Sequence, residues 1–198
     1  MRVLEYGPDA LLVEVPDEAA IALAADARAA RLARDIVPGA QTVLLDGVAD
    51  PNRAHRWLAS WEFHPRQSSG ELVEIAVSYD GPDLAAVADL WGCSTAEVAR
   101  LHSGVEWVAA FGGFAPGFSY LRPLRATAAL ASVPRRAEPR PRVEPGSVGL
   151  AGLWSGIYPT ASPGGWQLIG RTDVVLWDLA RPVPSLLPPG TRVRFVAR

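Results

Sequence analysis

The sequence predicts an α+β fold in two parts, on the basis of the order of its segments and its placement of glycine and proline. Over about the first eighty residues, strand-like and helix-like segments alternate, which is typical of a small α+β sandwich with helices on one face of a sheet. The second half consists largely of short apolar runs separated by glycine and proline, which indicates a barrel or sandwich of short strands. The turn-forming segment 79–84, YDGPDL, places the predicted boundary between domains 1–80 and 81–198.

Each element of the first domain has a local signature. The alanine-rich segment 18–34 ends in arginine and predicts a helix. Asp50 followed by Pro51 predicts the start of a second helix, because proline is favoured in the first turn. Alternating apolar residues and turn signals predict the strands. The expected strands cover residues 3–6, 11–15, 41–47 and 71–79.

The second domain should begin with two short helices. Gly92 is a typical residue after the end of the first helix, and Ser94 with Glu97 has the spacing of a capping box for the second. His102 ends this second helix, where it is either a cation favoured by the helix C-terminus or a polar group presented to the following glycine-rich segment. Further strands are expected at 106–111, 166–169, 174–179 and 192–198.

Composition excludes several functional classes. With 198 residues, 49% of them hydrophobic, the chain can bury a sizeable core, and its net charge of -2 gives no electrostatic reason to bind nucleic acid or a membrane. No signal-peptide core or membrane-length apolar run is present, so a cytoplasmic protein is expected. Cys93 is the single cysteine and no metal site is expected. All 19 basic residues are arginine, so the chain offers no lysine for a Schiff base, a biotinyl group or a P-loop.

Two segments are candidates for binding chemistry, although no standard catalytic motif is present. Residues 134–145, PRRAEPRPRVEP, form either a solvated polyproline-like loop or a cluster of arginines that holds an anion. Residues 162–172, SPGGWQLIGRT, form either a simple hairpin or a glycine-lined backbone that a ligand approaches closely. The residue pattern leaves both pairs of alternatives open.

Several segments, taken together and in order, resemble the family of 5-oxoprolinase B subunits, which is also known as allophanate hydrolase subunit 1 or the KipI-type sporulation-kinase inhibitors. The resemblance covers most of residues 79–195 and is carried by short motifs that are rich in glycine, proline and arginine. These motifs are GFAPGFSYL (113–121), PRR (134–136), PR (139–140), GSVG (146–149), GIYP (156–159), SPGGWQLIGRT (162–172) and PPGTRVRF (188–195).

The resemblance implies a cyclophilin-like β-barrel domain that follows the smaller α+β domain. It also implies the B subunit of an ATP-dependent 5-oxoprolinase, which acts with C and A partner subunits to open the 5-oxoproline lactam to L-glutamate and is inactive alone. The resemblance also implies that the complex uses ATP with Mg²⁺, but it does not indicate which subunit binds them. The alternatives are a regulatory protein that inhibits a sporulation-type histidine kinase, or a carboxyltransferase-like module of a urea or allophanate pathway whose biotin is carried by another chain.

The resemblance further implies that four segments border one cleft, namely GFAPGFSYL (113–121), the PRR and PR motifs (134–140), GSVG (146–149) and SPGGW (162–166). His102 is the candidate for acid/base chemistry or a polar substrate contact. Trp154 and Arg122 stand where the family usually has glutamine and glycine, which puts the identity of the substrate in question. Phe114, Phe118 and Trp166 are interpreted as barrel packing more readily than as substrate contacts. The candidates for substrate or anion binding are Gly113, Phe114, Pro116, Gly117, Tyr120, Arg135, Arg136, Arg140, Ser147, Gly164, Gly165 and Arg171.

Overall fold

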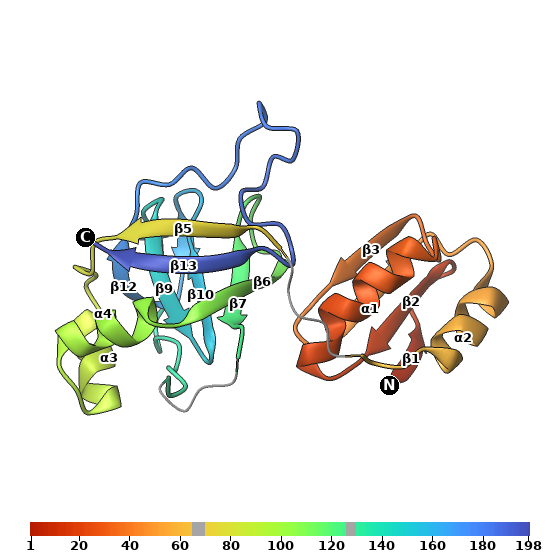
Figure 1. Ribbon diagram of the computed structural model, residues 1–198, viewed down its shortest axis with the longest axis horizontal. Helices are drawn as coiled ribbons and strands as arrows, with labels where there is room; N and C mark the ends of the chain where they lie inside the picture. Colours follow the sequence, from red (N-terminus) through yellow and green to blue (C-terminus); the bar gives the residue numbers. More distant parts are fainter. Residues whose placement is uncertain (65–69, 126–129) are drawn as a thin grey trace. The chain divides into compact units, whose positions relative to one another are not determined.

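Contacts within the chain divide it into two compact units, Met1–Gln67 and Ser68–Arg198. Both units contain helices and sheets, in agreement with the predicted α+β class. The computed structural model, shown in Figure 1, describes residues 1–64, 70–125 and 130–198, and only the backbone of Asp17 and Glu18. Within these three stretches, no helix is long and apolar enough to cross a membrane.

The first unit is an antiparallel four-stranded sheet, in the order β1-β2-β4-β3, with two helices packed on one face. Its core lies between helix residues such as Leu23 and Leu58 and strand residues such as Val13 and Leu45, all fully buried. The elements are β1 (Arg2–Glu5), β2 (Ala10–Glu14), α1 (Asp17–Ala29), β3 (Asp35–Pro38), β4 (Thr42–Asp46) and α2 (Pro51–Ser60).

Helix α1 ends well before the predicted end at residue 34, since its last residue is Ala29. Arg31 takes a positive φ of 51°, and the N–H groups of Arg31 and Leu32 donate to the carbonyls of Arg28 and Ala27. This is a Schellman motif, in which glycine is usual, so no local signal indicated it. The released chain then forms β3, a strand that was not predicted. Helix α2 begins as predicted, since the Asp50 side chain accepts a hydrogen bond from the N–H of Arg53 at 2.9 Å.

The second unit is built on a curled seven-stranded sheet in the order β12-β9-β10-β7-β6-β13-β5 (Figure 1). Its outer strands β5 and β12 are joined by two hydrogen bonds between Ser78 and Arg171, both 2.9 Å long. A separate two-stranded ribbon pairs β8 with β11. The strands are β5 (Leu72–Val77), β6 (Glu106–Gly112), β7 (Ser119–Pro123), β8 (Arg140–Val143), β9 (Ser147–Ala151), β10 (Trp154–Ile157), β11 (Ser162–Gly164), β12 (Gln167–Arg171) and β13 (Arg192–Ala197).

The division between the two units lies near residue 67, earlier than the predicted boundary at residues 80 and 81, because β5 belongs to the second unit. β5 pairs in parallel with β13 along its whole length, from Leu72 opposite Arg192 to Val77 opposite Ala197. The two strands lie near opposite ends of the second unit's sequence. The local pattern of β5 therefore carried no information about its partner.

The two short helices of the second unit are α3 (Leu84–Trp91) and α4 (Thr95–Ser103). Gly92 follows α3 with a φ of 65°, as its position predicted. Ser94 caps α4 by accepting a hydrogen bond from the N–H of Glu97. The reciprocal half of the predicted capping box does not form, because the Glu97 carboxylate instead binds the Arg100 guanidinium.

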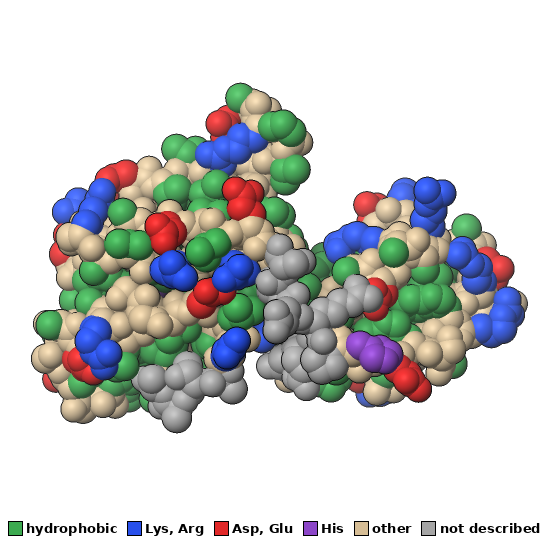
Figure 2. All heavy atoms as spheres, in the orientation of Figure 1, with side chains coloured by type: hydrophobic (Ala, Val, Ile, Leu, Met, Phe, Trp, Pro, Cys, Tyr) green, Lys and Arg blue, Asp and Glu red, His purple; other side chains and the backbone are tan. Residues whose placement is uncertain are grey.

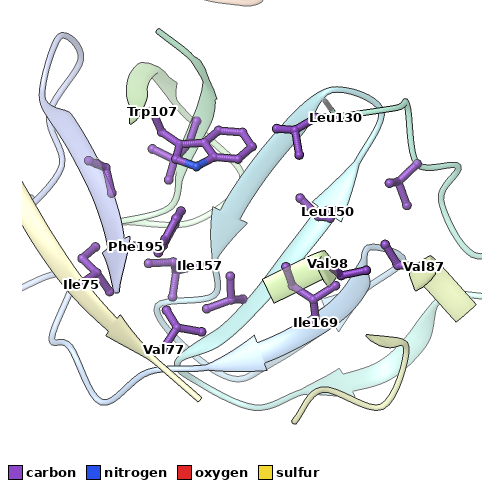
Figure 3. Packing of buried hydrophobic residues seen from close by; sticks show 14 of the residues in the cluster. Ile75, Val77, Val87, Val98, Trp107, Leu130, Leu150, Ile157, Ile169 and Phe195 are labelled. Atoms are coloured by element: carbon purple, nitrogen blue, oxygen red, sulfur yellow. The ribbon is translucent and has the colours of Figure 1, made fainter. Parts of the chain in front are cut away.

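The main core of the second unit fills the inside of the curled sheet. Figure 3 shows Phe195 near Ile157 and Ile75, and Trp107 packs edge to face on Phe195 at 6.2 Å; all four are nearly or fully buried. The strand expected at 174–179 is wrong: it belongs to a long loop between β12 and β13. This loop buries Leu176 but exposes its neighbours along a projection from the sheet (Figure 1 and Figure 2). The apolar run VVLWDL therefore resembled a strand, although the chain forms a loop there.

Candidate binding pocket

A cavity of about 220 Å³ lies in the second unit, beside the β8–β11 ribbon. It is bordered by three of the four segments that were expected to share a cleft, namely 113–121, 134–140 and 162–166, whereas the described residues of 146–149 are not in its lining. Aromatic rings form most of its walls, glycine and proline form one edge, and Arg135 supplies a charge. The lining residues are Phe114, Phe118, Tyr120, Arg135, Pro139, Tyr158, Pro163, Gly164, Gly165 and Trp166.

The aromatic walls pack mainly edge to face. The ring of Phe118 lies 5.5 Å from Tyr158 and 5.4 Å from Trp166, measured between centroids, with interplanar angles of 75° and 89°. Gly156 of β10 makes this packing possible, since a Cβ there would lie 2.9 Å from Phe118 and 3.0 Å from Trp166. The rings that were interpreted as barrel packing thus also form a pocket, in a cluster separate from the main core.

Strand β10 and the residue after it divide the pocket from the main core. Ser155 and Ile157 are buried toward the core inside the sheet, whereas Gly156 and Tyr158 face the aromatic cluster. This alternation follows from the two-residue period of a β-strand. Contacts on the core-facing side of β10 therefore also affect the shape of the pocket on its other side.

Tyr158 provides a neutral hydroxyl at the floor of the pocket. Burial raises the pKa of Tyr158, partly opposed by a backbone hydrogen bond from Trp166 and by nearby arginines, so the phenol keeps its proton at neutral pH. The chain passes very close to this hydroxyl at Gly164, where a Cβ would lie 2.3 Å from the Tyr158 oxygen. Gly164 is therefore required for the ribbon to border the pocket.

Arg135 is the only charged residue among the described residues that line the pocket. Its side chain is exposed, and the described part of the structure gives it no ion pair. A guanidinium without a carboxylate partner retains its capacity to bind an anion in two-pronged geometry. Of the four arginines in segment 134–145, Arg135 is thus the one that lines the pocket, and no ion pair holds it in the described part of the structure.

Arg136 and Arg140, also predicted to bind an anion, instead bind Asp83. The Asp83 carboxylate lies 3.0 Å from the Arg136 guanidinium and 2.7 Å from that of Arg140, and its side chain is 5% exposed. Burial alone would raise the pKa of Asp83, but hydrogen bonds from Arg140 and from the N–H of Leu168 outweigh it and keep the pKa below its ordinary value. The anion that these two arginines bind is therefore the Asp83 carboxylate of the same chain.

Asp83 was not recognised in the sequence, where it lies directly before α3. Its carboxylate joins the arginine segment to β12 through Leu168, and the N–H of Arg136 also donates to the carbonyl of Gly165 at 2.8 Å. These contacts fix the segment that carries Arg135 against the pocket. Asp83 is separated by about fifty residues from its arginine partners, so only a three-dimensional structure could reveal the pairing.

His102 lies in the main core and not in the pocket lining. Its side chain has no exposed surface, its ring stacks on Phe195, and its two ring nitrogens bond the hydroxyls of Tyr79 and Ser155, both at 2.8 Å. Burial lowers the pKa of His102 to about 3, so the ring is neutral at pH 7. Neither of its predicted roles, a helix-terminal cation or an acid/base group in the cleft, matches this placement.

The other expected site residues have structural partners or lie beside the pocket. Gly117 has a φ of 85° and packs against Leu176 and Trp177, while Arg171 pairs with Asp80 at 2.9 Å. Trp154 packs edge-on behind Tyr120 at 6.1 Å and does not itself line the cavity. The remaining residues outside the lining are Gly113, Pro116, Arg122 and Ser147.

Comparison with known proteins gives the family. Residues 1–187 match the model of the carboxyltransferase domain, subdomain C and D, and the chain belongs to this family. The chain is 46% identical over 165 residues to the B subunit of 5-oxoprolinase from Escherichia coli, a match that spans 81% of this chain and 72% of that protein. It is 44% identical over 128 residues to the B subunit of 5-oxoprolinase from Bacillus subtilis, spanning 63% of this chain and 52% of that protein.

A solved structure supports the same relationship. The crystal structure of TTHA0988 matches with a TM-score of 0.79 and 35% identity, over 96% of this chain and 40% of that chain. The chain thus spans about half to three quarters of the two curated relatives and well under half of this solved one.

Proposed function

We propose that this chain is the B subunit of an ATP-dependent 5-oxoprolinase, which opens the 5-oxoproline lactam to L-glutamate together with C and A partner subunits. The observation that carries the proposal is the pocket itself: a small aromatic cavity with one unpaired guanidinium, formed by the motifs that resemble this family. The names of the curated relatives support the same activity.

The dimensions and chemistry of the pocket suit this substrate class. A cavity of about 220 Å³ is smaller than the roughly 300–1,000 Å³ of sites for drug-sized ligands, and 5-oxoproline is a compact ring with one carboxylate. Arg135 would bind the carboxylate, and the aromatic walls would bury the ring carbons. The Tyr158 hydroxyl and the backbone N–H groups along 164–165 would donate hydrogen bonds to the amide oxygen, where negative charge develops.

The complex would use ATP with Mg²⁺, and the pocket of about 220 Å³ is too small to hold a nucleotide beside the lactam. ATP supplies the phosphoryl group that activates the amide oxygen. This chain would hold and orient the lactam and exclude water from its apolar side. The proposed complex operates in the cytoplasm, where ATP is available, and the chain alone would be inactive.

We also propose that the second unit is a cyclophilin-like barrel. The Ser78–Arg171 bridge supports this assignment because it joins the two outer strands of the curled sheet. Glycines at 156 and 164 bring backbone and rings close enough to form the pocket on the outside of this barrel.

The test is glutamate release from 5-oxoproline and ATP by the full chain mixed with purified C and A subunits. The complete mixture should be active, and omission of this chain should abolish activity. Arg135→Ala should raise the KM for 5-oxoproline by about tenfold to a hundredfold, the loss of one charge-assisted contact. Arg142→Ala is the matched control, since Arg142 pairs with Glu144 outside the pocket. An inactive complete mixture of folded, associated subunits would reject the proposal.

A carboxyltransferase-like function is the second candidate, and the description of the matching family favours it. Because the chain has no lysine, a biotinyl group would have to come from another chain. The two functions differ in their requirements: the carboxyltransferase needs a biotinylated partner and bicarbonate-derived carboxyl groups, whereas the hydrolase releases glutamate without biotin. Avidin, which sequesters biotin, should therefore leave glutamate release unchanged.

A further inference from the structure

The loop between β6 and β7 holds Phe114 in an unusual backbone conformation. Its φ is 70°, and Arg31 is the only other non-glycine residue with a positive φ in the described stretches. The N–H of Ala115 donates to the carbonyl of Gly113 at 2.8 Å, which closes a three-residue γ-turn around Phe114. A γ-turn with positive φ is rare and strained, and a bulky side chain at positive φ adds to the strain.

The rest of the loop prevents this turn from relaxing. The N–H of Phe118 donates to the carbonyl of Ala115 at 3.0 Å, and the N–H of Gly113 donates to the carbonyl of Phe118 at 3.2 Å. Gly117 is itself in the left-handed region and packs against the backbone of Leu176. Strained residues persist where the surroundings over-determine them in this way, and such residues cluster at ligand sites.

The turn directs the Phe114 ring to the pocket. The ring lines the cavity and lies edge-on to Phe118 at 5.3 Å and to Tyr158 at 6.0 Å. The residue nevertheless remains 59% exposed, so burial of its ring contributes little stability. Burial therefore does not explain why a phenylalanine stands here, since glycine would adopt this conformation without strain. A function for the ring in the lining of the pocket supplies that reason.

We infer that Phe114 contacts the ligand and determines its size, because a strained turn holds its largely exposed ring in the lining of the pocket. For its ligand class, a small cyclic amide with a carboxylate, this inference rests on the proposed function. The ring lies against the apolar face of the ligand, while Arg135 binds the carboxylate. A smaller side chain at this position weakens binding and admits larger lactams.

The test compares Phe114→Gly and Phe114→Ala in the full chain, with Leu179→Ala as the control. Leu179 is an exposed apolar residue outside the pocket lining. Calorimetric titration uses 5-oxoproline, its six-membered homologue 6-oxopiperidine-2-carboxylate, and benzoate, which needs only an aromatic wall and a cation. Both Phe114 variants should bind 5-oxoproline and benzoate about tenfold more weakly and discriminate less against the larger lactam, whereas the control should match the wild type.

Thermal unfolding of the same variants tests whether the backbone at position 114 is strained. Because glycine adopts positive φ without strain, Phe114→Gly should unfold at a higher temperature than Phe114→Ala, the reverse of the usual order. An alanine variant as stable as the glycine variant would overturn the inference, as would unchanged affinities in both variants. If the wild type binds benzoate but not 5-oxoproline, the proposed substrate is wrong, and the benzoate affinities of the variants decide the inference. If it binds neither compound, the inference fails, whereas the proposed function is decided separately by glutamate release from the complete mixture.

Discussion

Replacing Asp83 with asparagine should destabilise the second unit and loosen the pocket. Asparagine retains an oxygen for the N–H of Leu168 but loses the charge that holds Arg136 and Arg140. Removing one partner of a fully buried pair costs about 3–5 kcal/mol, and a hydrogen bond to a charged group contributes about 1.5–3 kcal/mol. Since the side chains of Arg136 and Arg140 are 35% and 21% exposed, water can partly replace the lost contacts. We therefore expect a loss of about 2–3 kcal/mol.

Urea unfolding of the full chain at pH 7 measures this loss, with Glu144→Gln as the control. Glu144 pairs with Arg142 in an exposed ion pair, which contributes about 0–1 kcal/mol. The Asp83 variant should also bind 5-oxoproline more weakly, because Arg135 is carried by the segment that Asp83 fixes. An Asp83 variant as stable as the control variant would refute the reasoning that this carboxylate holds the arginine segment in place.

The effect of Asp83 should also depend on pH. The pKa of Asp83 is lower in the folded chain than in the unfolded chain, where it is about 3.9. A group of this kind contributes stability above its unfolded pKa, and the contribution is lost as the pH falls through the folded pKa. The difference between wild type and Asp83→Asn should therefore stay constant from pH 7 to about pH 5 and shrink below about pH 4. A difference that grows in more acidic solution would contradict this assignment.

Two further predictions concern His102 and Gly164. The pKa of His102 is about 3 in the folded chain and about 6.5 when unfolded, so the unfolded chain binds the extra proton and stability should fall as the pH drops below about 6.5. The free energy of unfolding should fall by about 1.4 kcal/mol per pH unit, and this loss should be absent in His102→Gln. If the stability curves of wild type and variant run parallel from about pH 7 to 5, the low pKa of His102 is contradicted. Gly164→Ala should abolish ligand binding by forcing the ribbon away from the Tyr158 hydroxyl. Gly112→Ala should bind normally in the same titration, because a Cβ there would have 3.6 Å of clearance and the residue lies outside the pocket lining.

The sequence predicted the segments of the pocket better than the residues within them. Segments 113–121, 134–140 and 162–166 do border one cavity, whereas 146–149 does not contribute to its lining. Which arginine faces that cavity depends on Asp83, a partner distant in sequence, and this kind of information is absent from local patterns. The same limit explains why the division between the units lies earlier than expected, because β5 finds its parallel partner only at the other end of the second unit.

Local signals succeeded where the chemistry of one turn determines the structure, as at Asp50 and Gly92. They failed where ordinary residues adopt unusual conformations. Arg31 ends a helix in a position typical of glycine, and Phe114 occupies a γ-turn that its side chain disfavours. The burial of His102 could not be inferred either, since a histidine at a helix end is expected to be exposed until the strand opposite it is known.

The contact between Gly156 and the rings of Phe118 and Trp166 constrains how this pocket can evolve. A side chain at position 156 would meet the tips of those two rings, so a larger residue there requires the rings to shift or positions 118 or 166 to carry smaller residues. A relative with a larger residue at 156 should carry smaller residues at 118 or 166, with a pocket of different shape. Changes of ligand within the family would then arise as coupled substitutions across three separate strands and loops, and a library that varies these positions singly would miss them.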